Sequence, residues 1–211
     1  MYKCLKQQTF VSGNYSLVPI RMDDRYDIMQ WRNEQIYHLR QKEPLTEAQQ
    51  DKYFEDVVSK LFDQEKPEQI LFSFLEDKKL IGYGGLVHID WENRNAEVSF
   101  LQKIEDDLYL WENFLKLLFE LSFKELNFLK IYTYAFDIRP KLYPILELNG
   151  FIKEATLVNH IIINEKPTNV VLHSKFNNDH GINRRLADFQ DAGLLFDWIN
   201  DVEVRRQSLN S

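Results

Sequence analysis

The side chains best suited to proton transfer in this sequence lie on segments that are rich in strand-forming residues. Glu97 lies in NAEVSFLQ, His88 in GLVHIDW and His160 in VNHIII. A partly buried carboxylate holds a proton more strongly than an exposed one and can act as a general base, directly or through water. A histidine can do the same because it titrates near neutral pH. These three residues are therefore the candidates for acid–base chemistry.

Each of these residues also has a purely structural interpretation. In an alternating strand Glu97 and Ser99 share one face while Val98 and Phe100 share the other, so Glu97 either enters a site or points outward. The two histidines stand alone on their strands, where such a residue is often a satisfied structural group. Both interpretations stay open at this stage.

Other kinds of reactive site have no signature in the sequence. The five histidines are scattered and the one cysteine, Cys4, lies near the N-terminus, so no metal site is predicted. The chain contains no Gly-x-Ser-x-Gly string and no Walker motif, which argues against a serine hydrolase and a P-loop nucleotide-binding protein.

Composition narrows the class of protein. The 211 residues are enough for one substantial core, and 44% of them are hydrophobic. A net charge of −7 argues against nucleic acid and anionic membranes as partners. The single cysteine excludes an intramolecular disulfide framework, and the first residues lack the apolar core of a signal peptide. No apolar run is long enough to span a bilayer. We therefore expect a cytoplasmic protein.

Hydrophobic periodicity predicts strands and helices in the order β-αα-βββ-α-β-α-ββ. Thr46 and Gln49 form a capping-box pattern at the start of the second helix. Strands are expected at 16–21, 69–76, 79–91, 95–102 and 130–137, followed by a closing hairpin to residue 176. This order predicts an α/β (α+β) protein with a mixed, mostly antiparallel sheet.

The C-terminal residues repeat the spacing of the beginning of the chain. With an offset of 167 residues Trp31 falls on Trp198, and DDRYDIMQWRNE matches QDAGLLFDWIND. A period of one domain length indicates a tandem arrangement, and two unrelated amphipathic helices are the alternative. We divide the chain into an N-terminal extension (1–14), a first domain (15–176), a linker (177–182) and the start of a truncated second domain (183–211). So short a piece cannot bury a core of its own, so we expect a homodimer or pairing through this segment.

Several strings resemble the GNAT acetyltransferase superfamily, namely LVPIRMDDRYDIMQWRNE, IGYGGLVHIDWENRNAEVSF, and the run from LNFLKIYTYAFD through LELNGFIKEATLVNH to VVLHS. The closest likeness is to the branch that acts on ribosomal-protein N-termini and amino sugars, and the tail resembles the opening of a second GNAT-like domain. The resemblance implies the GNAT fold, with helices on both faces of the central sheet, and acetyl-CoA as co-substrate.

The resemblance also assigns residues to the coenzyme. The strand AEVSFLQ is expected to pair with the pantetheine arm, and its last three residues are the contacts, Phe100, Leu101 and Gln102. Arg139 stands where the family often has an asparagine that contacts the pantetheine.

The next turn is expected to offer backbone N–H groups to the pyrophosphate at Asp107, Leu108 and Tyr109. The family has a Gln/Arg-x-x-Gly-x-Gly/Ala pattern here, because glycine lets the backbone approach phosphate closely. This chain has KIEDDLYLW instead, with acids at 105, 106 and 107 that repel an anion. The alternative interpretation is a well-capped helix without a coenzyme.

Further residues are assigned to catalysis and to the acceptor. Tyr143 lies one helical turn from the place where the family often has a tyrosine that protonates the leaving thiolate, and packing is its alternative role. The acceptor wall is implied to include Arg32, Asn33 and Arg40, where an arginine would hold an anionic acceptor. His160 would reach the same cleft from the late hairpin.

These assignments predict an acetyl-CoA-dependent N-acetyltransferase. Its acceptor would be a primary amine of a small molecule, most plausibly an amino sugar of surface-polysaccharide synthesis, with a protein N-terminus second. Glu97 or His88 would assist deprotonation of the amine. The alternative is a degenerate GNAT-like domain that does not bind CoA and serves a partner domain as a scaffold or acceptor-binding module.

Overall fold

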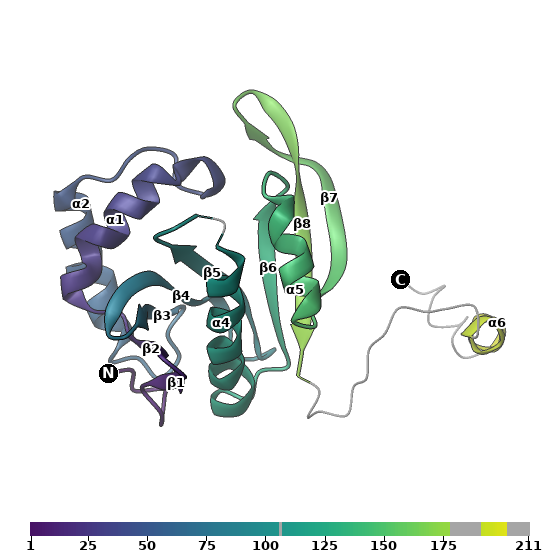
Figure 1. Ribbon diagram of the computed structural model, residues 1–211. Coiled ribbons are helices and arrows are strands. Elements are labelled where there is room, and N and C mark those ends of the chain that lie inside the picture. The colour runs from purple at the N-terminus through teal and green to yellow at the C-terminus, as the bar shows by residue number, and fades with distance from the viewer. Residues whose placement is uncertain (106, 178–190, 202–211) are drawn as a thin grey trace. The chain divides into compact units, whose positions relative to one another are not determined.

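A computed structural model describes residues 1–105, 107–177 and 191–201 of the chain. The chain divides into two units, residues 1–177 and 178–211. The first unit contains an eight-stranded sheet in the order β1-β2-β3-β4-β5-β6-β8-β7 (Figure 1). The strands are β1 (Phe10–Ser12), β2 (Tyr15–Pro19), β3 (Ile70–Glu76), β4 (Lys79–Asp90), β5 (Asn95–Gln102), β6 (Lys130–Phe136), β7 (Ile152–Ile163) and β8 (Lys166–Phe176).

Within the described residues every neighbouring pair of strands is antiparallel except β5 with β6, which run parallel. The prediction of a mixed, mostly antiparallel sheet is therefore confirmed. The parallel pair requires a crossover between its strands, and α4 (Leu108–Phe119) provides it.

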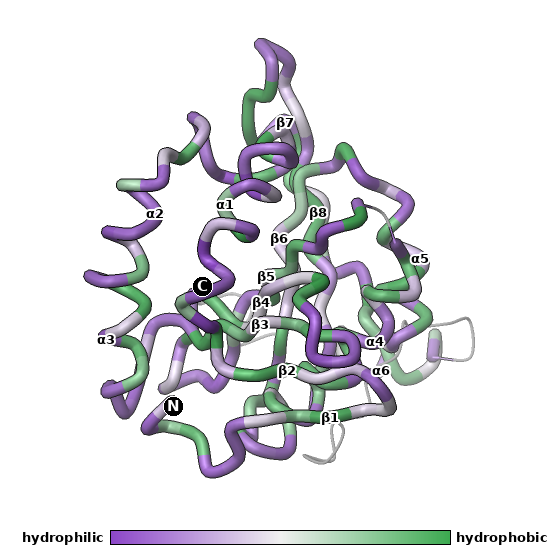
Figure 2. Tube along the Cα trace, turned by 60° about the vertical axis from the view of Figure 1, so that its left-hand side comes forward, coloured by the Kyte–Doolittle hydropathy of each residue, from purple (hydrophilic) through white to green (hydrophobic). Residues whose placement is uncertain are grey.

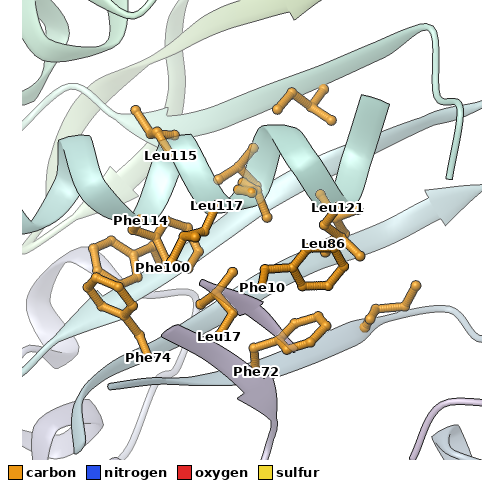
Figure 3. Close-up of a cluster of buried hydrophobic side chains, with 14 of the residues drawn as sticks. Phe10, Leu17, Phe72, Phe74, Leu86, Phe100, Phe114, Leu115, Leu117 and Leu121 are labelled. Atoms are coloured by element: carbon orange, nitrogen blue, oxygen red, sulfur yellow. The ribbon is translucent and has the colours of Figure 1, made fainter. Parts of the chain in front are cut away.

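Helices cover both faces of the sheet, as the resemblance implied. Figure 3 shows Phe114 and Leu117 of α4 against Phe74 and Phe100 of the sheet, and α5 (Tyr143–Leu148) contributes to the same core. The core on the opposite face is covered by α1 (Arg25–Glu34) and a π-helical turn (Phe54–Val58), which α2 (Glu47–Tyr53) precedes and α3 (Ser59–Leu61) follows. Figure 2 shows hydrophilic and hydrophobic residues alternating along α2 and α3, as expected of helices with one buried side.

Strand β3 shows why the sheet has two apolar faces. Ile70, Phe72 and Phe74 are buried in the core beneath α4, whereas Leu71 is buried in the core beneath α1. Successive strand residues point to opposite faces, so a continuous apolar run such as ILFSFL fits a central strand covered on both sides.

Local sequence signals agree with the structure at several places. Thr46 caps α2 with a complete capping box that involves Gln49, and the strand expected at 95–102 has those bounds. The closing hairpin is also present, and its turn lies at Asn164 and Glu165, which both have positive φ.

The first residues of the chain contribute to the core of the first unit. Residues 10–12 form β1, which pairs with β2, and Phe10 and Tyr2 are almost completely buried. The Tyr2 hydroxyl also donates to the carbonyl of Leu71 and accepts from its N–H, both at 2.8 Å. The segment expected as an extension (1–14) thus packs as part of the domain.

Strand β4 is interrupted by two register shifts. One extra residue, Ile81, lies beside Gly82 opposite β3, and a second irregularity lies between Val87 and Asp90 opposite β5. The first of these shifts lies directly beside a glycine. Gly85 has a different role: its φ is +149°, and a Cβ there would lie 2.0 Å from the carbonyl oxygen of Ile70.

In the second unit the structure describes residues 191–201, which include α6 (Ala192–Asn200). This helix begins 167 residues after the start of α1, the offset of the sequence repeat. Leu194, Leu195 and Phe196 are exposed. The expected linker (177–182) lies outside the described residues from 178 onward, as do residues 183–190 and 202–211 of the expected second domain. The repeat and its pairing stay predictions. None of the described helices is long and apolar enough to cross a membrane.

Candidate active site

The candidate site is a cleft where two parallel strands separate. Strands β5 and β6 pair at only three positions, the last of which joins Glu97 to Tyr132. Beyond it β5 continues to Gln102 and β6 to Phe136 without pairing with each other, and their ends point apart in Figure 1. A cavity of ≈ 690 Å³ lies at this place, lined by 97–100 of β5 and 133–136 of β6. Arginines 32, 40 and 139 line it as well.

The open edge of β5 offers backbone groups to a ligand. The N–H of Lys103 donates to the carbonyl of Ile81 at 2.8 Å across the β4–β5 pair. Backbone groups alternate between the two edges of a strand, so those of Val98 and Phe100 point away from β4, toward the cleft. The last β5–β6 pair uses the N–H of Val98, so an extended ligand chain can pair with the Val98 carbonyl and the Phe100 groups as a further strand would.

Glu97 lies at the point where the two strands separate. Its side chain is only 12% exposed, and its two oxygens accept hydrogen bonds from Nη2 of Arg40 at 2.8 and 2.9 Å. The guanidinium of Arg40 also lies over the ring of Tyr134, 4.5 Å from its centroid. A carboxylate so buried requires a cationic partner, and Arg40 provides it from the segment that follows α1. Glu97 and Arg40, which the sequence analysis assigned to the site separately, thus contact each other.

His88 joins this pair through an irregular backbone. It lies within the second register shift of β4 and has a φ of +49°. Its Nε2 accepts from Nη1 of Arg40 at 2.8 Å, and that nitrogen is 3.9 Å from Glu97. Because a guanidinium can only donate, Nε2 of His88 is the acceptor in this contact. A β-bulge often redirects a side chain next to a functional site.

Tyr143 also lines the cleft, from the first turn of α5. Its hydroxyl donates to Oδ1 of Asp137 at 2.9 Å. Burial raises the pKa of Tyr143, and the hydrogen bond to Asp137 raises it further. A phenol whose pKa is raised is a weaker proton donor, so this environment is unfavourable for protonating a thiolate.

The turn after β5 is occupied by the chain's own carboxylate. Oδ1 of Asp107 accepts from the N–H groups of Tyr109 at 3.0 Å and Leu110 at 3.2 Å. Glu105 accepts a hydrogen bond from the Tyr37 hydroxyl, and Asp106 lies outside the described residues. The backbone donor expected at Tyr109 is therefore used by a helix cap, and Leu108 and Asp107 do not line the cleft.

The other residues expected at the coenzyme have mixed positions. Phe100 lines the cleft, whereas Leu101 is buried in the core beneath α1. The carbonyl of Gln102 accepts from Nε2 of Gln35 at 2.9 Å, and its side chain is buried outside the lining. Arg139 lines the cleft and contacts the ring of His38 at 3.0 Å.

Three residues expected at the acceptor lie in different surroundings. Arg32 lines the cleft and donates to the Tyr83 hydroxyl at 2.7 Å. Asn33 does not line it, because its amide donates to the carbonyl of Leu45 and accepts from the N–H of that residue. His160 is exposed, packs edge-to-face on Tyr134 and is not part of the lining.

Sequence reasoning missed some members of the cleft. Tyr134, Thr133 and His38 all line it. Tyr134 and Thr133 looked like ordinary strand formers, and His38 followed the first helix without a motif. The adjacent positions of Thr133 and Tyr134 on the strand after the crossover were the one available signal. Among the described residues no group of histidine, cysteine, aspartate or glutamate side chains could hold a metal ion.

Comparison with known protein families gives one match. Residues 17–172 match the family model described as acetyltransferase (GNAT) domain. No curated protein sequence matches the chain.

Several solved structures share the fold. Spermidine N-acetyltransferase from Vibrio cholerae, in complex with CoA and spermine, superposes with a TM-score of 0.71 at 19% identity, over 81% of this chain and 100% of that one. Mutant forms of the spermidine/spermine N-acetyltransferase from the same organism give 0.68 at 21% identity, over 80% and 97%. A probable acetyltransferase gives 0.65 at 18% identity, over 81% and 98%. At these identities the likeness concerns the fold.

Proposed function

The chain belongs to the GNAT acetyltransferase family, an acyltransferase family that uses acetyl-CoA, and from this membership we propose that its β5–β6 cleft acetylates a primary amine of a small molecule. The observation that carries the proposal is Glu97, a nearly buried carboxylate at the point where the two strands separate. The carbonyl of Val98 and the backbone groups of Phe100, which face away from β4 beyond the last β5–β6 pair, would pair with the extended arm of the coenzyme.

In the transfer, the amine nitrogen forms a bond to the acetyl carbonyl carbon while the bond from that carbon to sulfur breaks. The amine loses one proton and the thiolate gains one, so the products are an amide and free CoA. Glu97 accepts the amine proton, directly or through a water molecule, because it is the carboxylate nearest the end of strand pairing. Arg40 holds that carboxylate in place, and solvent returns a proton to the sulfur.

The acceptor that we propose first is an amino sugar, and a protein N-terminus is the second candidate. Both present a single primary amine. The polyamines named for the similar solved structures are less suitable, because the three arginines that line this cleft outnumber its two carboxylates, and the remaining positive charge repels a polycation.

The proposal is tested by following the release of free thiol from acetyl-CoA with a panel of primary amines. We expect Glu97→Gln to lower kcat by about 100-fold or more, because a general base contributes factors of that order. Glutamine keeps an oxygen that accepts from Arg40, so the site should stay folded.

Glu112→Gln is the matched control. Glu112 pairs with Lys116 on the surface of α4 and does not line the cleft, so we expect its kcat to be unchanged. Wild-type kcat in Glu97→Gln, or no transfer to any amine by the wild type, would refute the proposal.

A further inference from the structure

We infer that Arg32 forms an anion-binding subsite in the acceptor wall, and hence that the acceptor carries a carboxylate or phosphate in addition to its amine. This inference rests on the proposed function and narrows its substrate class. It concerns the guanidinium of a half-buried residue of α1 that lines the cleft.

Arg32 differs from nearby arginines in its partners. Its Nη1 donates to the Tyr83 hydroxyl at 2.7 Å and its Nε donates to Oε1 of Gln41 at 2.9 Å. Both partners are neutral, and among the described residues no carboxylate forms an ion pair with Arg32. Arg21, Arg25 and Arg40 each pair with a carboxylate, on Asp24, Asp51 and Glu97.

An unneutralised guanidinium is costly in a partly buried position, and an anion that binds there offsets the cost. The guanidinium of Arg32 is also preorganised for such a ligand. Tyr83 and Gln41 fix the plane of the guanidinium through two of its five N–H groups, so less side-chain freedom is lost when a planar or tetrahedral anion binds to the others.

Arg32 lies on the side of the sheet where the amine is expected, rather than along the strand edge that would pair with the coenzyme arm. Gln41, which binds Arg32, directly follows Arg40, which binds Glu97. Glu97 lies on the strand face opposite Phe100, so its carboxylate and Arg32 belong to the side of the sheet covered by α1. One acceptor can therefore place its amine at Glu97 and its anion at Arg32.

The overall charge of the lining agrees with this assignment. The lining contains three arginines and two acids, namely Arg32, Arg40, Arg139, Glu68 and Glu97. Two histidines and the tyrosines are its other titratable groups. Such a wall favours a zwitterionic or anionic amine over a polyamine, whose charges are all positive at neutral pH.

The test compares glucosamine with glucosamine 6-phosphate, and both with spermidine, in the acetyl-CoA assay. For the wild type we expect KM to be about 10- to 100-fold lower for the phosphorylated amine, the range given by one charge-assisted hydrogen-bonded pair. Arg32→Gln should raise KM for the phosphorylated amine by a similar factor and KM for glucosamine by much less. Arg25→Gln, on the same helix but outside the cleft lining, is the control and should keep the preference.

A second variant keeps the test informative if Arg32→Gln is unstable. Tyr83→Phe removes the hydroxyl that holds Nη1 of Arg32, and we expect a smaller loss of preference, about 3- to 10-fold. Equal KM values for the two sugars in the wild type, or a preference for spermidine, would overturn the inference while leaving acetyl transfer intact.

The anion bound by Arg32 could instead be a phosphate of CoA, and calorimetry with CoA distinguishes this alternative from an anionic acceptor. If Arg32→Gln weakens CoA binding and leaves the acceptor preference unchanged, the guanidinium binds a phosphate of the coenzyme and the inference is wrong. Unchanged CoA affinity together with the lost preference supports it. If the wild type acetylates no amine at all, the proposed function has failed, and the inference falls with it.

Discussion

His173 shows how burial of a single residue creates pH dependence. Its side chain is fully buried on β8, and neither ring nitrogen has a hydrogen-bond partner in the part of the chain that the structure describes. The ring lies 4.9 Å from that of Tyr143, and Nε2 is 3.6 Å from a carboxylate oxygen of Glu147. Burial lowers the pKa of His173, and the carboxylate of Glu147 opposes this with a smaller effect.

The sign of the effect follows from proton counting. Between the lowered pKa of the folded protein and the ordinary value near 6.5, the unfolded chain binds a proton that the folded chain does not. We therefore expect stability to fall as the pH drops below about 6.5. Thermal melts at pH 7.5 and 5.5 measure this loss of stability. The decrease in Tm between the two pH values should be smaller in His173→Phe than in the wild type. Replacing the exposed His160 in His160→Phe should give the same decrease as the wild type. An equal decrease in all three proteins would contradict the assignment to His173.

At the scale of elements, α4 begins with a cap at the place where the coenzyme's pyrophosphate is expected. The Asp107 carboxylate accepts from two backbone N–H groups of the first turn, so a phosphate at that turn must compete with it for the same donors. The strand before the turn and the helix after it keep their expected places. The difference from the family pattern is confined to the side chains of the turn.

Replacing that cap should separate helix stability from coenzyme affinity. We expect Asp107→Ala to cost about 1 kcal/mol of stability, the usual value of a helix cap. It should also tighten CoA binding by about 3- to 5-fold, because it frees two N–H groups and removes a nearby negative charge. Urea unfolding and titration calorimetry measure the two quantities.

Thr46→Ala is the matched control, because Thr46 caps α2 and does not line the cleft. It should lose similar stability without any change in CoA affinity. Weaker CoA binding by Asp107→Ala would show instead that the cap organises the turn for the coenzyme. If neither the wild type nor the variant bound CoA, the scaffold interpretation of this domain would be favoured.

At the scale of the whole molecule, the first twelve residues supply Tyr2, Leu5 and Phe10 to the core of the first unit. Phe10 is 2% exposed and packs edge-to-face on Phe72, while its neighbour Val11 is 66% exposed. We expect Phe10→Ala to lower the free energy of unfolding by about 3–5 kcal/mol, as is usual for a buried aromatic residue. Val11→Ala, on the same strand, should change it by no more than about 0.5 kcal/mol. Similar urea midpoints for both variants would show that this segment is dispensable.

The elements of this protein could be predicted because their signals are local. Alternation at 95–102 and the capping box of Thr46 and Gln49 act over a few residues, and both are present in the structure. Strand β1 was missed, because three residues are too few to show a period. The family pattern at 15–176 also followed from the order of such elements, and the family model over 17–172 agrees with it.

The sequence by itself therefore determined the succession of strands and helices, the family, and the residue types from which a site could be built. Only the tertiary structure decided which of them meet. Arg40 and Glu97 are 57 residues apart in the chain, and Arg32 and Tyr83 are 51 apart. His88 reaches Arg40 from an irregular position of β4. These contacts depend on how two strands separate and how helices pack over them, and long-range packing leaves no periodic trace in one sequence.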